Sequence, residues 1–118
     1  ADQSKLPRIF YVNWFRKTAE GQWLWPGYGD NSRVLKWIFE RCDGQGKTQK
    51  TAIGWMPTID AIDRPNGVSE SDMVQLLSLD KEGWLEEIEA IKEHYAKFGD
   101  RLPAELNTQL QQLQQRLA

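Results

Sequence analysis

The clearest periodic pattern of apolar and polar positions lies in the last third of the chain. Its apolar residues recur at spacings of four and three: Trp84, Ile88, Ile91, Tyr95 and Phe98. These spacings put apolar side chains on one face of an α-helix, and a glycine often follows the last helical residue. The pattern therefore predicts a long amphipathic helix with Gly99 as its C-cap.

A second stripe of apolar residues ends the chain, set among glutamines: Leu106, Leu110, Leu113 and Leu117. Proline is tolerated in the first turn of a helix, so this last helix is predicted to begin near Pro103. Three turns are too few to favour a coiled coil with a partner. We expect the stripe to pack on its own domain.

Two shorter helices are indicated upstream. One is marked by an apolar stripe that Asp30 or Asn31 can cap: Val34, Leu35, Ile38, Phe39 and Cys42. The other begins at Ser69, where Asp72 three positions later completes a capping box, and it extends through Leu77.

Two segments are rich in β-branched and aromatic residues. Ile9–Phe15 is apolar at both alternating sets of positions, which is typical of a central strand covered on both faces. Thr51–Met56 is the other candidate strand, and two strands alone make a marginal sheet. Between Ile9–Phe15 and the first helix lies an irregular loop, Arg16–Asp30, rich in Gly, Pro and aromatic residues. The predicted fold class is α+β, with one or two buried strands, this loop and about four helices.

Length and composition limit the possible functions. The 118 residues form a single segment, 1–118, which we divide into a strand, loop and helix part (1–57) and a helical end (58–118). No apolar run approaches the length of a membrane span and no signal peptide is visible, so we expect a cytoplasmic protein without membrane contact. A single cysteine and a single histidine exclude a disulfide framework and a multi-His metal site. Because Cys42 closes an apolar stripe, it is expected to be buried.

Charge is distributed unevenly along the chain. Residues 1–50 carry nine Lys and Arg against five acids, whereas residues 51–118 carry six against twelve. A basic first part can face an anionic ligand. The segment Gly44–Thr48 resembles part of a phosphate loop, but Arg41 stands where that motif requires glycine, so we interpret it as a connector.

Aromatic residues gather in the first part, where four of the six tryptophans fall within 24 positions. Phe15, together with Trp23 or Tyr28, can supply opposing faces for a flat heterocycle, and the Asn31 amide can then hydrogen-bond the base edge. The alternative is that these aromatics pack the loop onto the domain while Asn31 only caps the helix. The residues alone leave both interpretations open.

Three motifs of this region carry a resemblance to a known family: Asn13-Trp14-Phe15-Arg16-Lys17, Leu24-Trp25-Pro26-Gly27 and Gly29-Asp30-Asn31-Ser32-Arg33-Val34-Leu35. In these residues the chain resembles the C-terminal end of GTP-dependent phosphoenolpyruvate carboxykinases. The resemblance implies a fragment of an α/β nucleotide-binding domain. It also implies that Phe15, Trp23 and Tyr28 enclose guanine and that Asn31 hydrogen-bonds its edge. The family usually has Phe at the positions of Trp23 and Tyr28.

The resemblance further implies the parent reaction, a gluconeogenic decarboxylation in which oxaloacetate and GTP give phosphoenolpyruvate, GDP and carbon dioxide. In that family the phosphate loop and the ligands of the divalent metal, manganese or magnesium, lie upstream of the matching region. We therefore expect GTP and the remainder of the same enzyme chain as partners, no nucleic acid, and no catalytic or metal-binding residue in this segment. Two other classes remain open, namely an aromatic groove at Trp23–Pro26 for proline-rich peptides and a structural helical fragment without a ligand.

Overall fold

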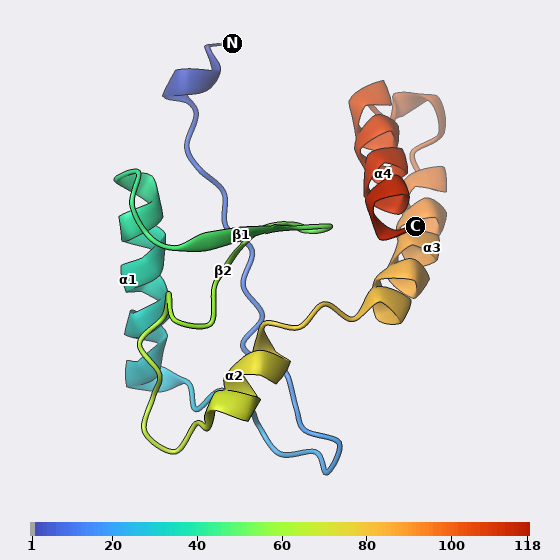
Figure 1. The fold of residues 1–118 in the computed structure, drawn as a ribbon. Helices are drawn as coiled ribbons and strands as arrows, with labels where there is room; N and C mark the ends of the chain where they lie inside the picture. Colours follow the sequence, from blue (N-terminus) through green and yellow to red (C-terminus); the bar gives the residue numbers. More distant parts are fainter. Residues whose placement is uncertain (1) are drawn as a thin grey trace. The chain divides into compact units, whose positions relative to one another are not determined.

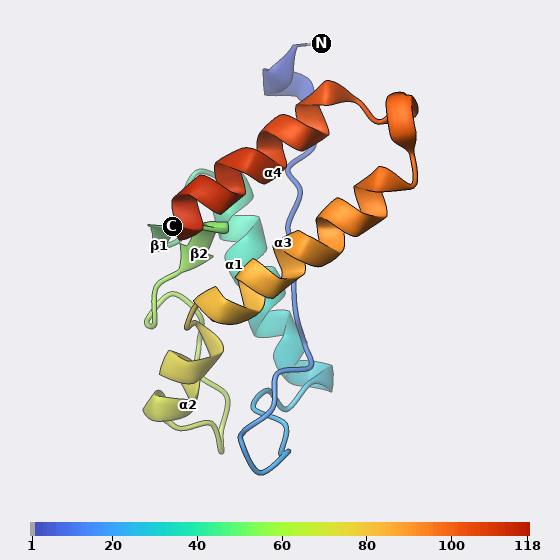
Figure 2. The ribbon, with the colours of Figure 1, turned by 90° about the vertical axis from the view of Figure 1, so that its right-hand side faces the viewer.

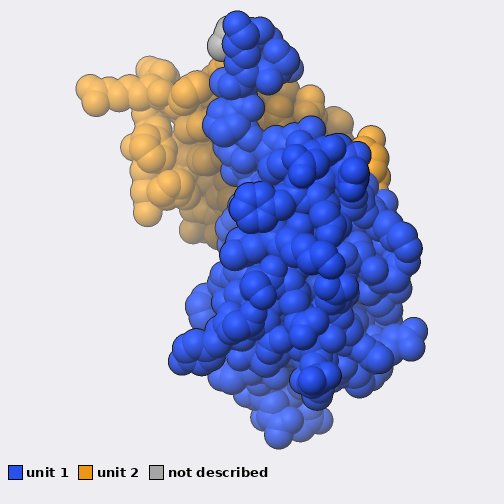
Figure 3. Space-filling model, turned by 90° about the vertical axis from the view of Figure 1, so that its left-hand side faces the viewer, with its two compact units in different colours: residues 1–49, 56–78 blue, residues 50–55, 79–118 orange. Residues whose placement is uncertain are grey.

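The computed structural model describes residues 2–118, and in this part of the chain it places helices and a two-stranded sheet (Figure 1). The elements are η1 (Gln3–Lys5), η2 (Tyr28–Asp30), α1 (Asn31–Cys42), β1 (Thr48–Thr51), β2 (Gly54–Pro57), α2 (Glu70–Leu76), α3 (Lys81–Ala96), η3 (Gly99–Arg101) and α4 (Ala104–Leu117). They form two compact units, residues 1–49 with 56–78 and residues 50–55 with 79–118, coloured separately in Figure 3. The α+β class is confirmed.

The first unit is built on a core of residues that are far apart in the sequence: Trp25, Trp37, Ile62, Val68 and Met73. Trp37 comes from α1, and its indole Nε1 donates a hydrogen bond to the carbonyl oxygen of Lys47 at 2.9 Å. Met73 comes from α2, which opens with the predicted capping box between Ser69 and Asp72. Loops therefore supply as much of this core as helices do.

Helix α1 forms as predicted, but the expected burial of Cys42 is wrong, because its side chain is exposed. Val34, Trp37 and Ile38 lie on the face that packs against the core. Leu35, Phe39 and Cys42 follow one another at helical spacing on the neighbouring face, and Leu35 and Phe39 are exposed as well. The apolar stripe is wider than the face that the core covers.

The predicted central strand Ile9–Phe15 is not a strand in the structure. Phe10 and Trp14 pack partly buried against the core of the first unit, whereas Ile9 and Tyr11 are each 91% exposed. The segment is apolar on both faces, but only one face is covered. A central strand needs a hydrogen-bonded neighbour on each side, and none of the other described segments pairs with this one.

The second predicted strand, Thr51–Met56, is a hairpin in the structure. Strands β1 and β2 pair with each other, and Ala52–Ile53 form the turn between them. Gly54, which follows the turn, has a φ of 122°, a conformation that glycine adopts without a steric penalty. The prediction is therefore confirmed for Gly54–Met56, which lie in β2, and wrong for Ala52–Ile53, where a tight turn interrupts the segment.

The second unit contains the antiparallel helices α3 and α4, which run side by side in Figures 1 and 2. Its core consists of Ile88, Leu110 and Leu117, and Ile88 is only 1% exposed. Both amphipathic helices are confirmed, although α3 ends at Ala96 and a short 3-10 turn follows where the prediction extends to Gly99. The leucine stripe of α4 packs within its own unit, as expected.

Candidate functional site

The irregular loop before α1 begins with a tight reversal of the backbone. The amide of Leu24 donates to the carbonyl of Arg16 at 3.0 Å, and Lys17 and Trp23 form an isolated antiparallel bridge. Gly21 lies inside the reversal with a φ of 83°, in the left-handed region that favours glycine. This turn brings Trp23 back to the side of the chain that carries Phe15.

Phe15 and Trp23 are thereby in direct contact. Their ring centroids are 5.9 Å apart with an angle of 61° between the planes, an edge-on arrangement typical of aromatic pairs. The two side chains nevertheless remain 70% and 57% exposed. The Lys17 ammonium lies 4.3 Å from the centroid of the Trp23 ring, so it covers part of that ring with a positive charge. The pair forms an exposed aromatic surface beside a cation.

Asn31 is the first residue of α1, and its side chain contacts the loop. The indole Nε1 of Trp25 donates a hydrogen bond to Asn31 Oδ1 at 2.8 Å. The N-cap position belongs to Asp30, whose carboxylate pairs with Arg33 at 2.9 Å and makes no capping bond. The capping interpretation of Asn31 is therefore wrong, since its oxygen bonds the loop and not a backbone amide of the helix.

Tyr28 protrudes from the loop at the start of η2. Its side chain is 96% exposed, and its φ of 50° is uncommon for a residue other than glycine. The structure thus brings Phe15 and Trp23 together and ties Asn31 to the same loop through Trp25. It leaves Tyr28 extended into solvent, away from a packed position.

Burial within the loop separates residues that the sequence does not distinguish. Leu24 and Trp25 are buried, whereas Trp23 and Pro26 are exposed. A peptide-binding groove built on Trp23–Pro26 therefore loses two of its four side chains to the interior. Sequence reasoning missed the bond from Trp25 to Asn31 and the position of Lys17, because neither contact has a signature in residue spacing.

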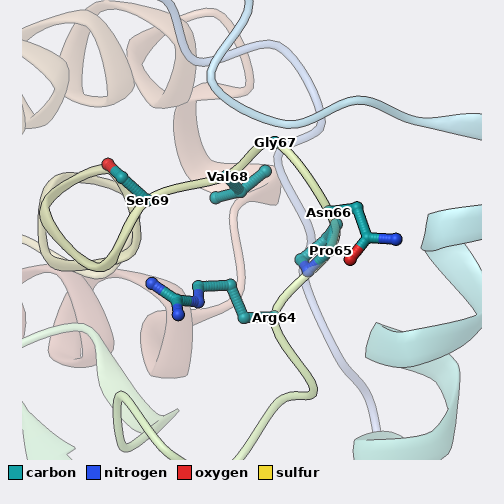
Figure 4. A pocket seen from close by; sticks show the side chains of 6 residues that line it. All are labelled: Arg64, Pro65, Asn66, Gly67, Val68 and Ser69. Atoms are coloured by element: carbon teal, nitrogen blue, oxygen red, sulfur yellow. The ribbon is translucent and has the colours of Figure 1, made fainter.

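A shallow hollow of about 430 Å³ lies elsewhere, at the loop between β2 and α2. It is lined by six consecutive residues of this loop, which Figure 4 shows from close by: Arg64, Pro65, Asn66, Gly67, Val68 and Ser69. The Arg64 guanidinium is the single charged group among them, and the Ser69 hydroxyl already accepts a bond from the Asp72 amide. This composition offers no nucleophile with an adjacent base.

Charge pairs in the first unit join its helix and loops rather than the aromatic surface. Hydrogen bonds from Lys47 and Thr58 lower the pKa of Asp60 to about 2. A hydrogen bond from Lys36 likewise lowers the pKa of Asp63 and raises that of the lysine. Within residues 2–118 no three His, Cys, Asp or Glu side chains gather to hold a metal ion, and no described helix is long and apolar enough to span a membrane.

Comparison with known proteins gives one consistent family. The family described as "Phosphoenolpyruvate carboxykinase C-terminal P-loop domain" matches residues 1–116. The chain is 55% identical over 119 residues to phosphoenolpyruvate carboxykinase (GTP) of Treponema pallidum (strain Nichols), covering 99% of this chain and 19% of that protein.

Two eukaryotic proteins of the same description also match. Identity is 49% to the protein of Neocallimastix frontalis, over 98% of this chain and 19% of the relative. It is 43% to the cytosolic protein of Gallus gallus, over 97% of this chain and 18% of the relative. The chain thus spans about a fifth of the length of the relatives that it resembles.

Proposed function

The chain belongs to the family of GTP-dependent phosphoenolpyruvate carboxykinases, within their C-terminal P-loop domain, and we propose on this ground that it supplies the guanine-binding part of the nucleotide site. The observation that carries the proposal is the exposed pair of Phe15, just before the loop Arg16–Asp30, and Trp23 within it; Asn31 directly follows this loop. Large aromatic side chains usually bury much of their surface, so an exposed pair is a candidate for contact with a flat ligand.

Phe15 and Trp23 give the base an aromatic surface, and stacking on such a surface contributes roughly 1 to 3 kcal/mol per base. Tyr28 completes the pocket in this proposal by turning its exposed ring onto the second face of the base. Asn31 supplies the edge contact. Lys17, close to Trp23, adds a positive charge that favours an anionic nucleotide.

The complete enzyme would convert oxaloacetate and GTP to phosphoenolpyruvate, GDP and carbon dioxide. Among residues 2–118 no three His, Cys, Asp or Glu side chains gather as a metal cluster, and in this proposal the divalent metal that such phosphoryl transfer uses is held by the rest of the enzyme. We assign this chain no catalytic or metal-binding residue. Its proposed partners are GTP and the remainder of the same enzyme chain, in the cytoplasm, the compartment named for the relative of Gallus gallus.

The extended segment Ile9–Phe15 offers the remainder of the enzyme a surface to bind. Ile9 and Tyr11 project from an extended segment that has no hydrogen-bonded neighbour strand among residues 2–118. Exposed apolar side chains on unpaired backbone favour addition of another strand. We propose that upstream parts of the enzyme cover this face of Ile9–Phe15, which would restore the buried strand that its sequence predicts.

Steady-state kinetics of the complete enzyme test the proposal with two phenylalanines that are equally exposed. Phe15→Ala should raise the KM for GTP about 5- to 150-fold, the equivalent of one lost stack, and leave the KM for oxaloacetate unchanged. Phe39 of α1 is also 70% exposed, and Phe39→Ala should change neither constant. Equal increases in both KM values for Phe15→Ala would contradict a guanine site.

The 118-residue chain by itself should show no carboxykinase turnover with GTP, oxaloacetate and manganese. Turnover above background from homogeneous protein would contradict the assignment of the chemistry to the rest of the enzyme. Quenching of tryptophan fluorescence by GTP measures binding separately from turnover, and it distinguishes a nucleotide site from a peptide groove or a purely structural segment.

A further inference from the structure

The hydrogen bond between Trp25 and Asn31 constrains which atom of the Asn31 amide is available to a ligand. An indole N–H can only donate, so the atom that meets it at 2.8 Å must be the amide oxygen Oδ1. Rotating the amide by 180° would place its NH₂ group against this donor. The buried indole would then have no acceptor, and such an unsatisfied buried donor is unfavourable.

Trp25 itself is held firmly. Its side chain is 7% exposed and belongs to the core of the first unit, where it packs with Trp37 and Met73. Asn31 is half-buried at the first residue of α1, so its backbone is held by the helix. A fixed donor and a fixed backbone together leave Asn31 one favourable amide orientation. In that orientation Oδ1 faces the core and Nδ2 is the free end.

We infer that Trp25 is a positioning residue for nucleotide selection, because its indole holds the Asn31 amide with Nδ2 as the donor presented to the base. This inference rests on the proposed guanine site. A fixed N–H donor matches the carbonyl oxygen of guanine, whereas adenine carries an amino group at the same position and would oppose donor to donor. Trp25 touches Asn31 and not the base in this arrangement.

The first test compares nucleotide preference in the complete enzyme carrying Trp25→Phe, which keeps an aromatic ring and removes the N–H group. The ratio of kcat/KM for GTP to that for ATP should fall about 2- to 12-fold, the range expected when one neutral hydrogen bond is lost. Inosine triphosphate keeps the carbonyl oxygen but lacks the 2-amino group of guanine. Its preference over ATP should fall by the same factor, leaving the ratio of GTP to inosine triphosphate unchanged.

Trp37 provides a matched control. It is 6% exposed in the same core, and its indole donates to a backbone carbonyl, that of Lys47. Trp37→Phe therefore removes a buried N–H donor of the same kind without touching Asn31, and it should leave all nucleotide ratios unchanged. A similar loss of selectivity in Trp37→Phe would assign the effect to the core in general and overturn the positioning role.

Asn31 variants separate this inference from the proposed function. Asn31→Ala should lower the preference for GTP over ATP, and adding Trp25→Phe to it should cause no further loss, because the indole acts through the amide. Asn31→Asp keeps an oxygen for the indole but loses the donor, so its GTP preference should also fall. If Trp25→Phe lowers selectivity further in the Asn31→Ala background, the positioning role is wrong.

Two other results have distinct meanings. A loss of GTP preference in Asn31→Ala with no change in Trp25→Phe would overturn the inference and leave the guanine site intact. If the preference for GTP over ATP is unchanged in both Asn31→Ala and Trp25→Phe, and the KM for GTP is unchanged in Phe15→Ala, the proposed guanine site is overturned as well as the inference. Should Trp25→Phe fail to fold, 3-benzothienylalanine at position 25 keeps the shape of tryptophan and replaces only the N–H group by sulfur, and the same ratios decide the question.

Discussion

The two compact units differ in which of their apolar side chains are buried. In the second unit, α3 and α4 bury one regular stripe each, around Ile88, Leu110 and Leu117. In the first unit, loops carry much of the core, and the segment before α1 leaves large apolar side chains exposed: Ile9, Tyr11, Phe15, Trp23 and Tyr28. The second unit thus has a core of regular helix packing, whereas the first leaves the aromatic residues of the proposed guanine site exposed.

The largest expected effect is on the stability of the second, helical unit. Ile88 is 1% exposed at the centre of its core, so Ile88→Ala should reduce the free energy of unfolding by about 2 to 5 kcal/mol. Leu106 belongs to the stripe of α4 but is partly exposed, and Leu106→Ala should have a much smaller effect. Urea denaturation of the chain measures both. Equal effects would show that the stripe packs differently from the structure.

The next effect concerns the aromatic surface of the first unit. Trp23→Ala should raise the KM for GTP in the complete enzyme by about 5- to 150-fold, while Trp23→Phe should be nearly neutral because it keeps a stacking ring. Trp55, in the second unit, has similar exposure, and Trp55→Ala should leave the KM for GTP unchanged. Indistinguishable effects at the two tryptophans would remove the functional contrast between the units.

A smaller effect on stability is expected at the N-terminus of α2, which is one of the α-helices of the first unit. Ser69→Ala removes one side of the capping box and should lower the free energy of unfolding by about 0.5 to 2 kcal/mol. Aspartate is an equally good N-cap, so Ser69→Asp should restore most of the loss. Thermal unfolding checks both variants. An unaffected Ser69→Ala variant would mean that solvent satisfies the helix terminus equally well.

The smallest effect depends on pH. Hydrogen bonds from Lys47 and Thr58 lower the pKa of Asp60 from 3.8 to about 2, so the folded state binds this proton less readily than the unfolded chain. The resulting stabilisation is complete above about pH 4 and is lost as the pH falls toward 2. The difference in melting temperature between the wild type and Asp60→Asn should shrink across this interval. A difference independent of pH would contradict the ion pair.

Several elements were predictable because their signals are local. The capping box at Ser69 depends on two residues three positions apart, and the stripes of α3 and α4 depend on helical spacing alone. At the candidate site, Phe15 and Trp23 contact each other edge-on and stay exposed, an arrangement that no residue spacing indicates. The guanine contacts of all four predicted residues remain predictions.

Other features depend on contacts between distant parts of the chain. The apolar stripe of α1 does not reveal that Cys42 lies outside the buried face. Which face of the helix is buried depends on its contacts with the other core residues, which come from distant parts of the chain. The composition of Ile9–Phe15 favours a central strand, but strand formation needs a paired neighbour. The spacing of apolar residues in α1 and the composition of Ile9–Phe15 therefore both overstate how much of each segment is buried.

By itself, the sequence of this protein determined the helices, the capping box and the set of aromatic residues in the loop, because these depend on spacing along the chain. Only the tertiary structure decided that Trp23 is exposed while Trp25, two residues later, is buried. It also decided that the Asn31 oxygen accepts the Trp25 indole rather than capping its helix. The physical reason is that burial and hydrogen-bond partners follow from which surfaces meet in space, and no local pattern of residues specifies that meeting.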